Sequence, residues 1–178
     1  MFGRRQGGFT LWELLVGLVV LSLILAYGLP AMARQIRQSE MLATEQAWVR
    51  LFQRARHRAV TIGTPVAFCH LGADGRCVPT DRGRTAVAVF EDADADGRIG
   101  PGERILWRDE GLYAPEGRGW SLRLTGSFRD GGIYLPDGRA IRPGGAFLAG
   151  SVRLCGPELG RRIVLNRTGR VRVEAERC

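Results

Sequence analysis

The segment DADADGRIGPGE, residues 92–103, carries acidic side chains at the spacing of a calcium-binding loop. It matches the EF-hand loop pattern at each position that the pattern specifies. In such a loop, side-chain oxygens come from three aspartates and a bidentate glutamate, and one backbone carbonyl adds a further oxygen. The candidate ligands are Asp92, Asp94, Asp96, Glu103 and the carbonyl of Arg98. Calcium is thus the only cofactor that the sequence suggests, and the pattern alone does not establish it.

The neighbouring residues support a different interpretation of this segment. Helices flank an EF-hand loop, whereas AVAVF before the segment and RILW after it read as strands. The alternative is an acidic turn of a β-hairpin, exposed to water and eased by Arg98 and Arg104. Against it, four carboxylates within a short loop repel one another unless a cation lies between them. Both interpretations stay open.

A second candidate site is the segment RRIVLNRTGRVRVE, residues 161–174. Side chains alternate between the faces of a strand, so Val171 and Val173 are expected in the core while Arg170 and Arg172 point outward. Such a cluster can bind the phosphates of a nucleic acid without reading its sequence. The alternative is an edge strand whose charges prevent edge-to-edge pairing. The candidate DNA-binding residues are the five arginines Arg161, Arg162, Arg167, Arg170 and Arg172.

The four cysteines, an even number, suggest disulfides formed in an oxidising compartment. Three connectivities are possible. We favour Cys69–Cys77, which closes a short hairpin, and Cys155–Cys178, which attaches the C-terminus. A metal site is the other possibility for these thiols, but no C-x-x-C spacing supports it.

No enzyme is predicted, because the chain lacks the G-x-S-x-G, H-E-x-x-H and P-loop patterns. The net charge is +8, and all 26 basic residues are arginines. This charge suits an anionic partner such as nucleic acid, lipid headgroups or an acidic protein surface.

The most apolar part of the chain lies near its N-terminus. Leu14–Ala33 is free of charged residues and would span about 30 Å as a helix, the thickness of the hydrocarbon core of a bilayer. A cleaved secretory signal is the alternative, with Ala31-Met32-Ala33 as a cleavage site, but its apolar region would be shorter. That alternative also leaves Glu13, next to the apolar run, without a role.

Beyond the apolar run, the helix is expected to continue to about Val60 with one apolar face. The members of this face are Trp48, Leu51, Phe52, Ala55 and Ala59. After Gly63, short alternating segments separated by turns read as eight strands: PVAFCH, TAVAVFE, RILWR, WSLRL, GIYL, SVRLC, RIVL and RVRVE. The expected fold class is α+β, with one long N-terminal helix packed on a mostly antiparallel sheet.

The segment RRQGGFTLWELL resembles the leader and first helix of the type IV pilin family. The resemblance implies that a prepilin peptidase cleaves after Gly8 and that the new N-terminal residue, Phe9, becomes N-methylated. Glu13 is at the position of the glutamate that is the hallmark of the family, and Pro30 is where many pilins kink their helix. In a filament, the resemblance implies that the Glu13 carboxylate pairs with the amine of a neighbouring subunit.

The remainder of the chain resembles the GspH/FimT branch of minor pilins and pseudopilins, chiefly in RARHRAVTIGTPVAFCH, AVAVFEDADADGRIGPGERIL and RRIVLNRTGRVRV. This implies a structural subunit of a type II secretion pseudopilus or a type IV pilus. The alternative is a DNA-uptake minor pilin that holds DNA through a Gly-Arg-x-Arg element, here Gly169–Arg172. Other pilins, the peptidase and the inner membrane are the implied partners.

The expected organisation follows the pilin pattern. Residues 1–8 form the leader, residues 9–33 the membrane-spanning half of the helix, residues 34–62 its amphipathic half, and residues 63–178 a β-rich globular domain in the periplasm. The chain would thus be a single-pass protein of the bacterial inner membrane.

Overall fold

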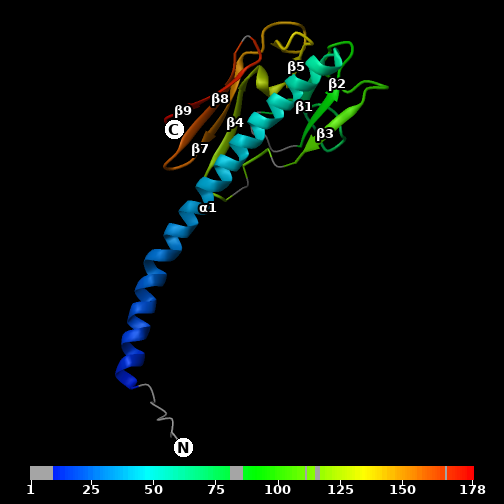
Figure 1. The fold of residues 1–178 in the computed structure, drawn as a ribbon. Helices are drawn as coiled ribbons and strands as arrows, with labels where there is room; N and C mark the ends of the chain where they lie inside the picture. The colour runs from blue at the N-terminus through cyan, green and yellow to red at the C-terminus, as the bar shows by residue number, and fades with distance from the viewer. Residues whose placement is uncertain (1–9, 81–85, 111, 115–116, 167) are drawn as a thin grey trace, which may run out of the picture. The chain divides into compact units, whose positions relative to one another are not determined.

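The structure is a computed structural model, and it describes residues 10–80, 86–110, 112–114, 117–166 and 168–178. Helix α1 (Leu11–Ile62) comes first, and a β-rich part follows it (Figure 1). Within the described residues the strands are β1 (Val66–His70), β2 (Val87–Glu91), β3 (Ile105–Asp109), β4 (Ser121–Gly126), β5 (Gly132–Tyr134), β6 (Ala140–Ile141), β7 (Gly150–Cys155), β8 (Gly160–Leu165) and β9 (Val171–Ala175), with a 3-10 turn at Ser127–Arg129. The α+β fold class predicted from the sequence, one long N-terminal helix packed on antiparallel strands, is confirmed.

The chain divides into two compact units, Met1–Arg37 and Gln38–Cys178, which are described separately. In the first unit, the apolar side chains of α1 are exposed all round. The most apolar 18-residue window of this helix has a mean hydropathy of 2.4, and none of it is buried. By length and composition, α1 can cross a membrane. Pro30 lies inside the helix and does not end it.

In the second unit, α1 buries one face. All five members of the predicted apolar face, from Trp48 to Ala59, are at most 2% exposed, which confirms that prediction. The helix runs two residues beyond the predicted end near Val60. Its last residue is Ile62, and Gly63 caps it: Gly63 has a positive φ of 68°, and its N–H donates to the Ala59 carbonyl at 3.1 Å.

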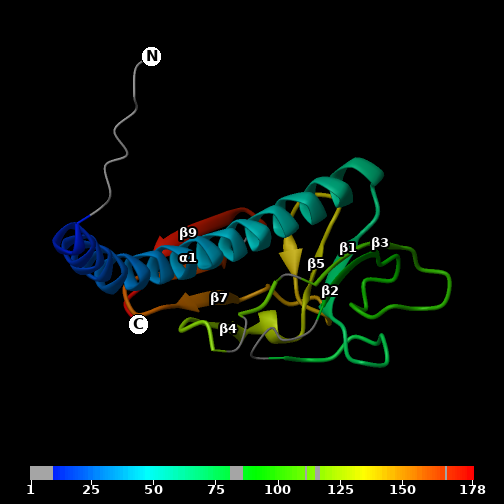
Figure 2. The same cartoon turned by 90° about the horizontal axis from the view of Figure 1, so that it is seen from below.

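The strands form two antiparallel sheets within the described residues, ordered β3-β2-β1-β5-β6 and β4-β7-β8-β9. In the view of Figure 2, β9 is drawn on one side of α1, and β4 and β7 are drawn on the other. All eight predicted strands are present, whereas β6 was not predicted because two residues are too short for an alternating pattern. Side chains of α1 and of both sheets share one core, in which the Phe52 ring lies 5.3 Å from Phe68 and 5.5 Å from Phe128.

The two sheets differ in their second faces. Behind the first sheet, Ala67, Cys69 and Phe90 belong to a smaller buried cluster. On the corresponding face of the second sheet the pairing register aligns Arg153 of β7 with Arg123 of β4 and Arg162 of β8. The face of the second sheet that carries Arg123, Arg153 and Arg162 is therefore separate from the core. An arginine on its opposite face points toward α1.

Candidate functional site

The acidic segment connects β2 to β3, so strands flank it, as its neighbouring residues predict. Asp92, Asp94 and Asp96 each offer a carboxylate oxygen, and these oxygens lie within 4.8 Å of one another. The carboxylate of Glu103 instead accepts hydrogen bonds from the backbone N–H groups of Ala93 (3.2 Å) and Gly100 (2.8 Å). The oxygen donors suit calcium, and three aspartates come together without the glutamate.

Asp92 is the buried member of this group, with no exposed surface. Its carboxylate accepts hydrogen bonds from the N–H groups of Gly97 (3.0 Å) and Asp96 (3.1 Å). Burial raises the pKa of Asp92 to about 7, and the hydrogen bond with Asp94 and the charge of Glu103 act in the same direction. A cation among the aspartates would reverse this effect by favouring the ionised form.

Of the two arginines next to the loop, Arg104 does not have the role expected from the sequence. Arg104 pairs with Glu91 of β2 rather than with the loop, and this hydrogen bond lowers the pKa of Glu91. The N–H of Arg98 donates to Asp96 Oδ1 at 2.6 Å. Backbone N–H groups thus donate hydrogen bonds to the carboxylates of the loop and hold it in shape.

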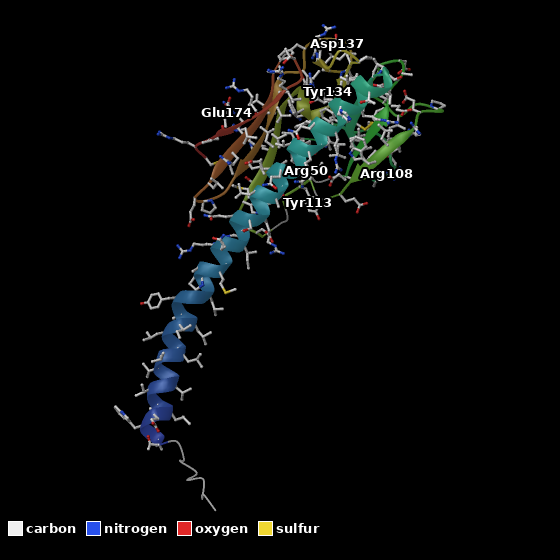
Figure 3. All side chains as sticks on the ribbon, viewed as in Figure 1. Arg50, Arg108, Tyr113, Tyr134, Asp137 and Glu174 are labelled. Carbon is white, nitrogen blue, oxygen red and sulfur yellow. A yellow bond between two sulfur atoms is a disulfide. The ribbon has the colours of Figure 1, made fainter. Side chains whose placement is uncertain are left out.

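The arginine segment does not form one cluster. Arg161 lies on the face of β8 toward α1, where its Nε donates to Glu45 Oε2 at 2.8 Å. Arg162 lies on the opposite face and pairs with Glu174 at 2.7 Å. This pair lowers the pKa of Glu174. Two of the five candidate DNA-binding arginines are therefore already paired with carboxylates, and Figure 3 shows Glu174 on the side of the sheet away from α1.

The rest of the segment lies in the β8–β9 hairpin. Arg170 and Arg172 are exposed, whereas Arg167 lies outside the described residues. Val171 packs against the core, but the prediction that Val173 enters the core is wrong, because this side chain is 38% exposed. Val173 pairs with the buried Ile163, yet β9 is an edge strand and has a neighbour on only one side.

The cysteines pair as the sequence favoured. Cys69 on β1 bonds to Cys77, and Cys155 on β7 bonds to Cys178 near the C-terminus. The second bond ties the C-terminal segment across β8, the strand that separates β7 from β9. With all four thiols used in disulfides, none is free to bind a metal.

In the N-terminal segment, Gly8 and Phe9 lie outside the described residues. The Glu13 carboxylate accepts hydrogen bonds from the N–H (2.9 Å) and the hydroxyl (3.0 Å) of Thr10. The Thr10 hydroxyl in turn accepts from the Glu13 N–H at 3.3 Å. This is a capping box, and its T-x-x-E pattern was a readable signal that we did not use in interpreting the sequence. Glu13 therefore stabilises the start of α1 within a single chain.

A cavity of about 420 Å³ lies between the C-terminal part of α1 and the β8–β9 turn. Its lining includes Arg56 and His57 from the helix and Gly169–Val171 from the turn. Arg56 Nε donates to the carbonyl oxygen of Gly138 at 3.0 Å. The sequence carried no local sign of this contact, since 82 residues separate the partners.

The long helix, apolar along its first part and packed on antiparallel sheets along its second, defines the class of pilin-like folds. The family model for the prokaryotic N-terminal methylation motif matches residues 3–29. The family model described as type II transport protein GspH matches residues 45–169, more than half of the chain. The chain belongs to the GspH family.

Solved structures show the same fold. Two crystal structures of the type IV minor pilin FimU from Pseudomonas aeruginosa PAO1, in space groups P21 and P65, match with TM-scores of 0.55 and 0.50. Each is 15% identical and aligns with 79% of this chain, and the alignments cover 95% and 97% of the FimU chains. No curated protein sequence matches the chain significantly.

Proposed function

We propose that this chain is a minor subunit of a filament machine anchored in the bacterial inner membrane, either a type II secretion pseudopilus or a type IV pilus. The observation that carries the proposal is the difference in burial between the first and second parts of α1. The side chains of its first part are apolar and exposed. Its second part contributes one face to the core of a globular unit. A filament that buries the first part would leave the globular unit on the outside, in the periplasm.

The proposed path of assembly begins with cleavage by the prepilin peptidase after Gly8 and methylation of Phe9. A charged side chain in hydrocarbon costs about 3 kcal/mol on insertion scales, so the Glu13 carboxylate needs a partner. In the single chain this partner is Thr10. In the filament, the Phe9 amine of a neighbouring subunit would provide a stronger, charged partner and fix the axial register.

The test is Glu13→Ala in cells that produce the filament. We expect normal cleavage of the leader but loss of the subunit from purified filaments. Glu110→Ala, at an exposed carboxylate of the globular unit, is the control and should be incorporated normally. Incorporation of the Glu13 variant at the wild-type level would contradict the proposed role of this carboxylate.

A second candidate function is DNA binding in DNA uptake. It is favoured by the exposure of Arg170 and Arg172, since no carboxylate among the described residues is hydrogen-bonded to either side chain. Glu174 is the acidic group near Arg172: its pKa is lowered mainly by the hydrogen bond from Arg162, and the charge of Arg172 adds to this effect. The net charge of +8 also attracts a polyanion. Arg161 and Arg162 are less suited to this function, since each already holds a carboxylate.

The test of this second candidate uses the full chain in a non-ionic detergent and duplex DNA of two unrelated sequences. Binding should be weak, alike for both sequences and steeply dependent on salt. The double variant Arg170→Ala/Arg172→Ala should lower the log–log salt slope by about 0.9 for each lost phosphate contact. Arg76→Ala, at an exposed arginine paired with Asp74, is the control. If the double variant binds as the wild type does, or if neither binds at low salt, this arginine cluster is not a DNA-binding site.

A further inference from the structure

Within the described residues, Arg56 of α1 is half-buried and has no carboxylate partner. Arg58, two residues later, pairs with Glu91 at 3.4 Å. The hydrogen bond from Arg56 Nε to the Gly138 carbonyl leaves the other guanidinium N–H groups without a partner among the residues that the structure describes. A partly desolvated guanidinium without a counter-charge favours binding of an anion.

The cavity beside Arg56 has a lining that suits an anion. Beyond Arg56, the described residues that line it include His57 and Arg170, together with the polar Gln53, and none of them is acidic. The nearest acidic neighbour in sequence to Gly138 is Asp137, whose carboxylate is already bonded to Arg139 at 2.6 Å. The hydrogen bonds from the backbone and side chain of Arg139 lower the pKa of Asp137, so the negative charge of Asp137 is balanced by Arg139. Among the described lining residues, two arginines, Arg56 and Arg170, therefore bring positive charge to the cavity, and no acidic side chain offsets it.

The walls of the cavity are tied to one another. Gly169 packs so closely on Gly138 that a Cβ at Gly169 would lie 2.2 Å from the Gly138 carbonyl oxygen. The Tyr134 hydroxyl donates to the Gly169 carbonyl at 3.4 Å, and its ring is buried in the core. Figure 3 shows Tyr134 and Asp137 at this end of the globular unit. Because Arg56 is bonded to the same Gly138 carbonyl, the guanidinium is held in place before any ligand arrives, which lowers the entropic cost of binding.

We propose that this cavity between α1 and the β8–β9 turn is a binding site for a single phosphate group, held by the Arg56 guanidinium with His57 and Arg170 beside it. The volume of about 420 Å³ is within the usual range of about 300–1,000 Å³ for small-ligand pockets and exceeds what a phosphate needs. The group attached to the phosphate therefore also has room. A phosphomonoester or one phosphate of a nucleic-acid backbone shares this chemistry. The site goes beyond the filament role, and its failure would leave the Glu13 experiment unaffected.

The experiment follows the nitrogen–proton NMR signals of the full chain in non-ionic detergent during titration with inorganic phosphate. Ionic strength is held constant with sodium chloride. We expect saturable shifts of the Arg56 side-chain signal and of the backbone signals of Gly169–Val171. Arg56→Gln should raise the Kd for phosphate about ten-fold or more, because a charge-assisted contact is lost. Arg54→Gln is the matched control, since Arg54 is exposed on the same helix and does not line the cavity.

A second variant and a second probe complete the design. His57→Gln changes an exposed lining residue that is not buried in the core, so the fold should be kept while the Kd rises. A short DNA duplex that competes with phosphate would identify a phosphodiester as the ligand, and the absence of competition would identify a phosphomonoester. The proposal is overturned if phosphate produces no saturable shift, or if Arg54→Gln weakens binding as much as Arg56→Gln.

Discussion

The ion pair between Glu45 of α1 and Arg161 of β8 offers the sharpest test of the arginine assignments. Arg161 Nε lies 2.8 Å from Glu45 Oε2, and the two side chains are 33% and 11% exposed. Because the carboxylate is buried more deeply than the guanidinium, we expect the two single truncations to differ in their effect on the free energy of unfolding.

The magnitudes follow from this difference in exposure. Arg161→Met leaves the Glu45 carboxylate buried without its partner. Breaking a fully buried pair costs about 3–5 kcal/mol, and partial access to water at the arginine lowers the expected loss to about 2 kcal/mol. Glu45→Gln keeps an amide oxygen as acceptor for an arginine that can reach water, so we expect a loss of about 1 kcal/mol. The double variant should show a coupling of about 1–2 kcal/mol.

The assay is urea unfolding of the full chain in non-ionic detergent, followed by tryptophan fluorescence. Arg162→Met is the control, because its pair with Glu174 is exposed on the other face of the sheet, and its stability should change little. If the wild type binds DNA, Arg161→Met should bind it with the same affinity under conditions where both are folded. A coupling free energy of zero between Glu45 and Arg161 would refute the structural role of this ion pair. So would an Arg161→Met variant that binds DNA more weakly than the wild type but has the same free energy of unfolding.

Three further predictions concern the globular unit. Burial lowers the pKa of His70, so the contribution of His70 to the free energy of unfolding should fall as the pH drops below about 6.5, by up to about 1.4 kcal/mol per pH unit. Asp92, whose pKa is raised, contributes in the opposite direction, so the His70 contribution is measured as the difference between the wild type and His70→Phe in urea unfolding at several pH values; a difference that does not change with pH would contradict it. Gly131→Ala should cost more than about 2 kcal/mol in the same assay, because its Cβ would lie 2.2 Å from a carbonyl oxygen, whereas Gly144→Ala, with a similar positive φ and open space, should cost about 1 kcal/mol; equal losses would contradict this account. If the acidic loop binds calcium, calcium at 100 times its Kd should add about 2.7 kcal/mol and raise the melting temperature over that in chelator, and Asp94→Asn/Asp96→Asn should remove the difference; identical melting of the wild type would exclude the site.

Patterns that are local in the sequence predicted much of the fold. The apolar run and the helical face from Trp48 to Ala59 follow from the period of a helix, which a chain displays whatever it packs against. The eight predicted strands follow from alternation between turn residues. Prediction was less complete where an element was too short to show a period, as at Ala140–Ile141, or where a position depended on neighbouring strands, as at Val173.

The arginines mark the limit of such reasoning. Sequence alone determined that Glu13 stands at the start of a long apolar segment, that the cysteines form an even set, and that five arginines lie within residues 161–172. Only the tertiary structure decided which charges stay free. Arg161 meets a carboxylate 116 residues away, while Arg56 meets a carbonyl 82 residues away and no acid within the described chain. A charge pair at such separations depends on how the helix and sheets pack, and the local period of a sequence does not encode that packing.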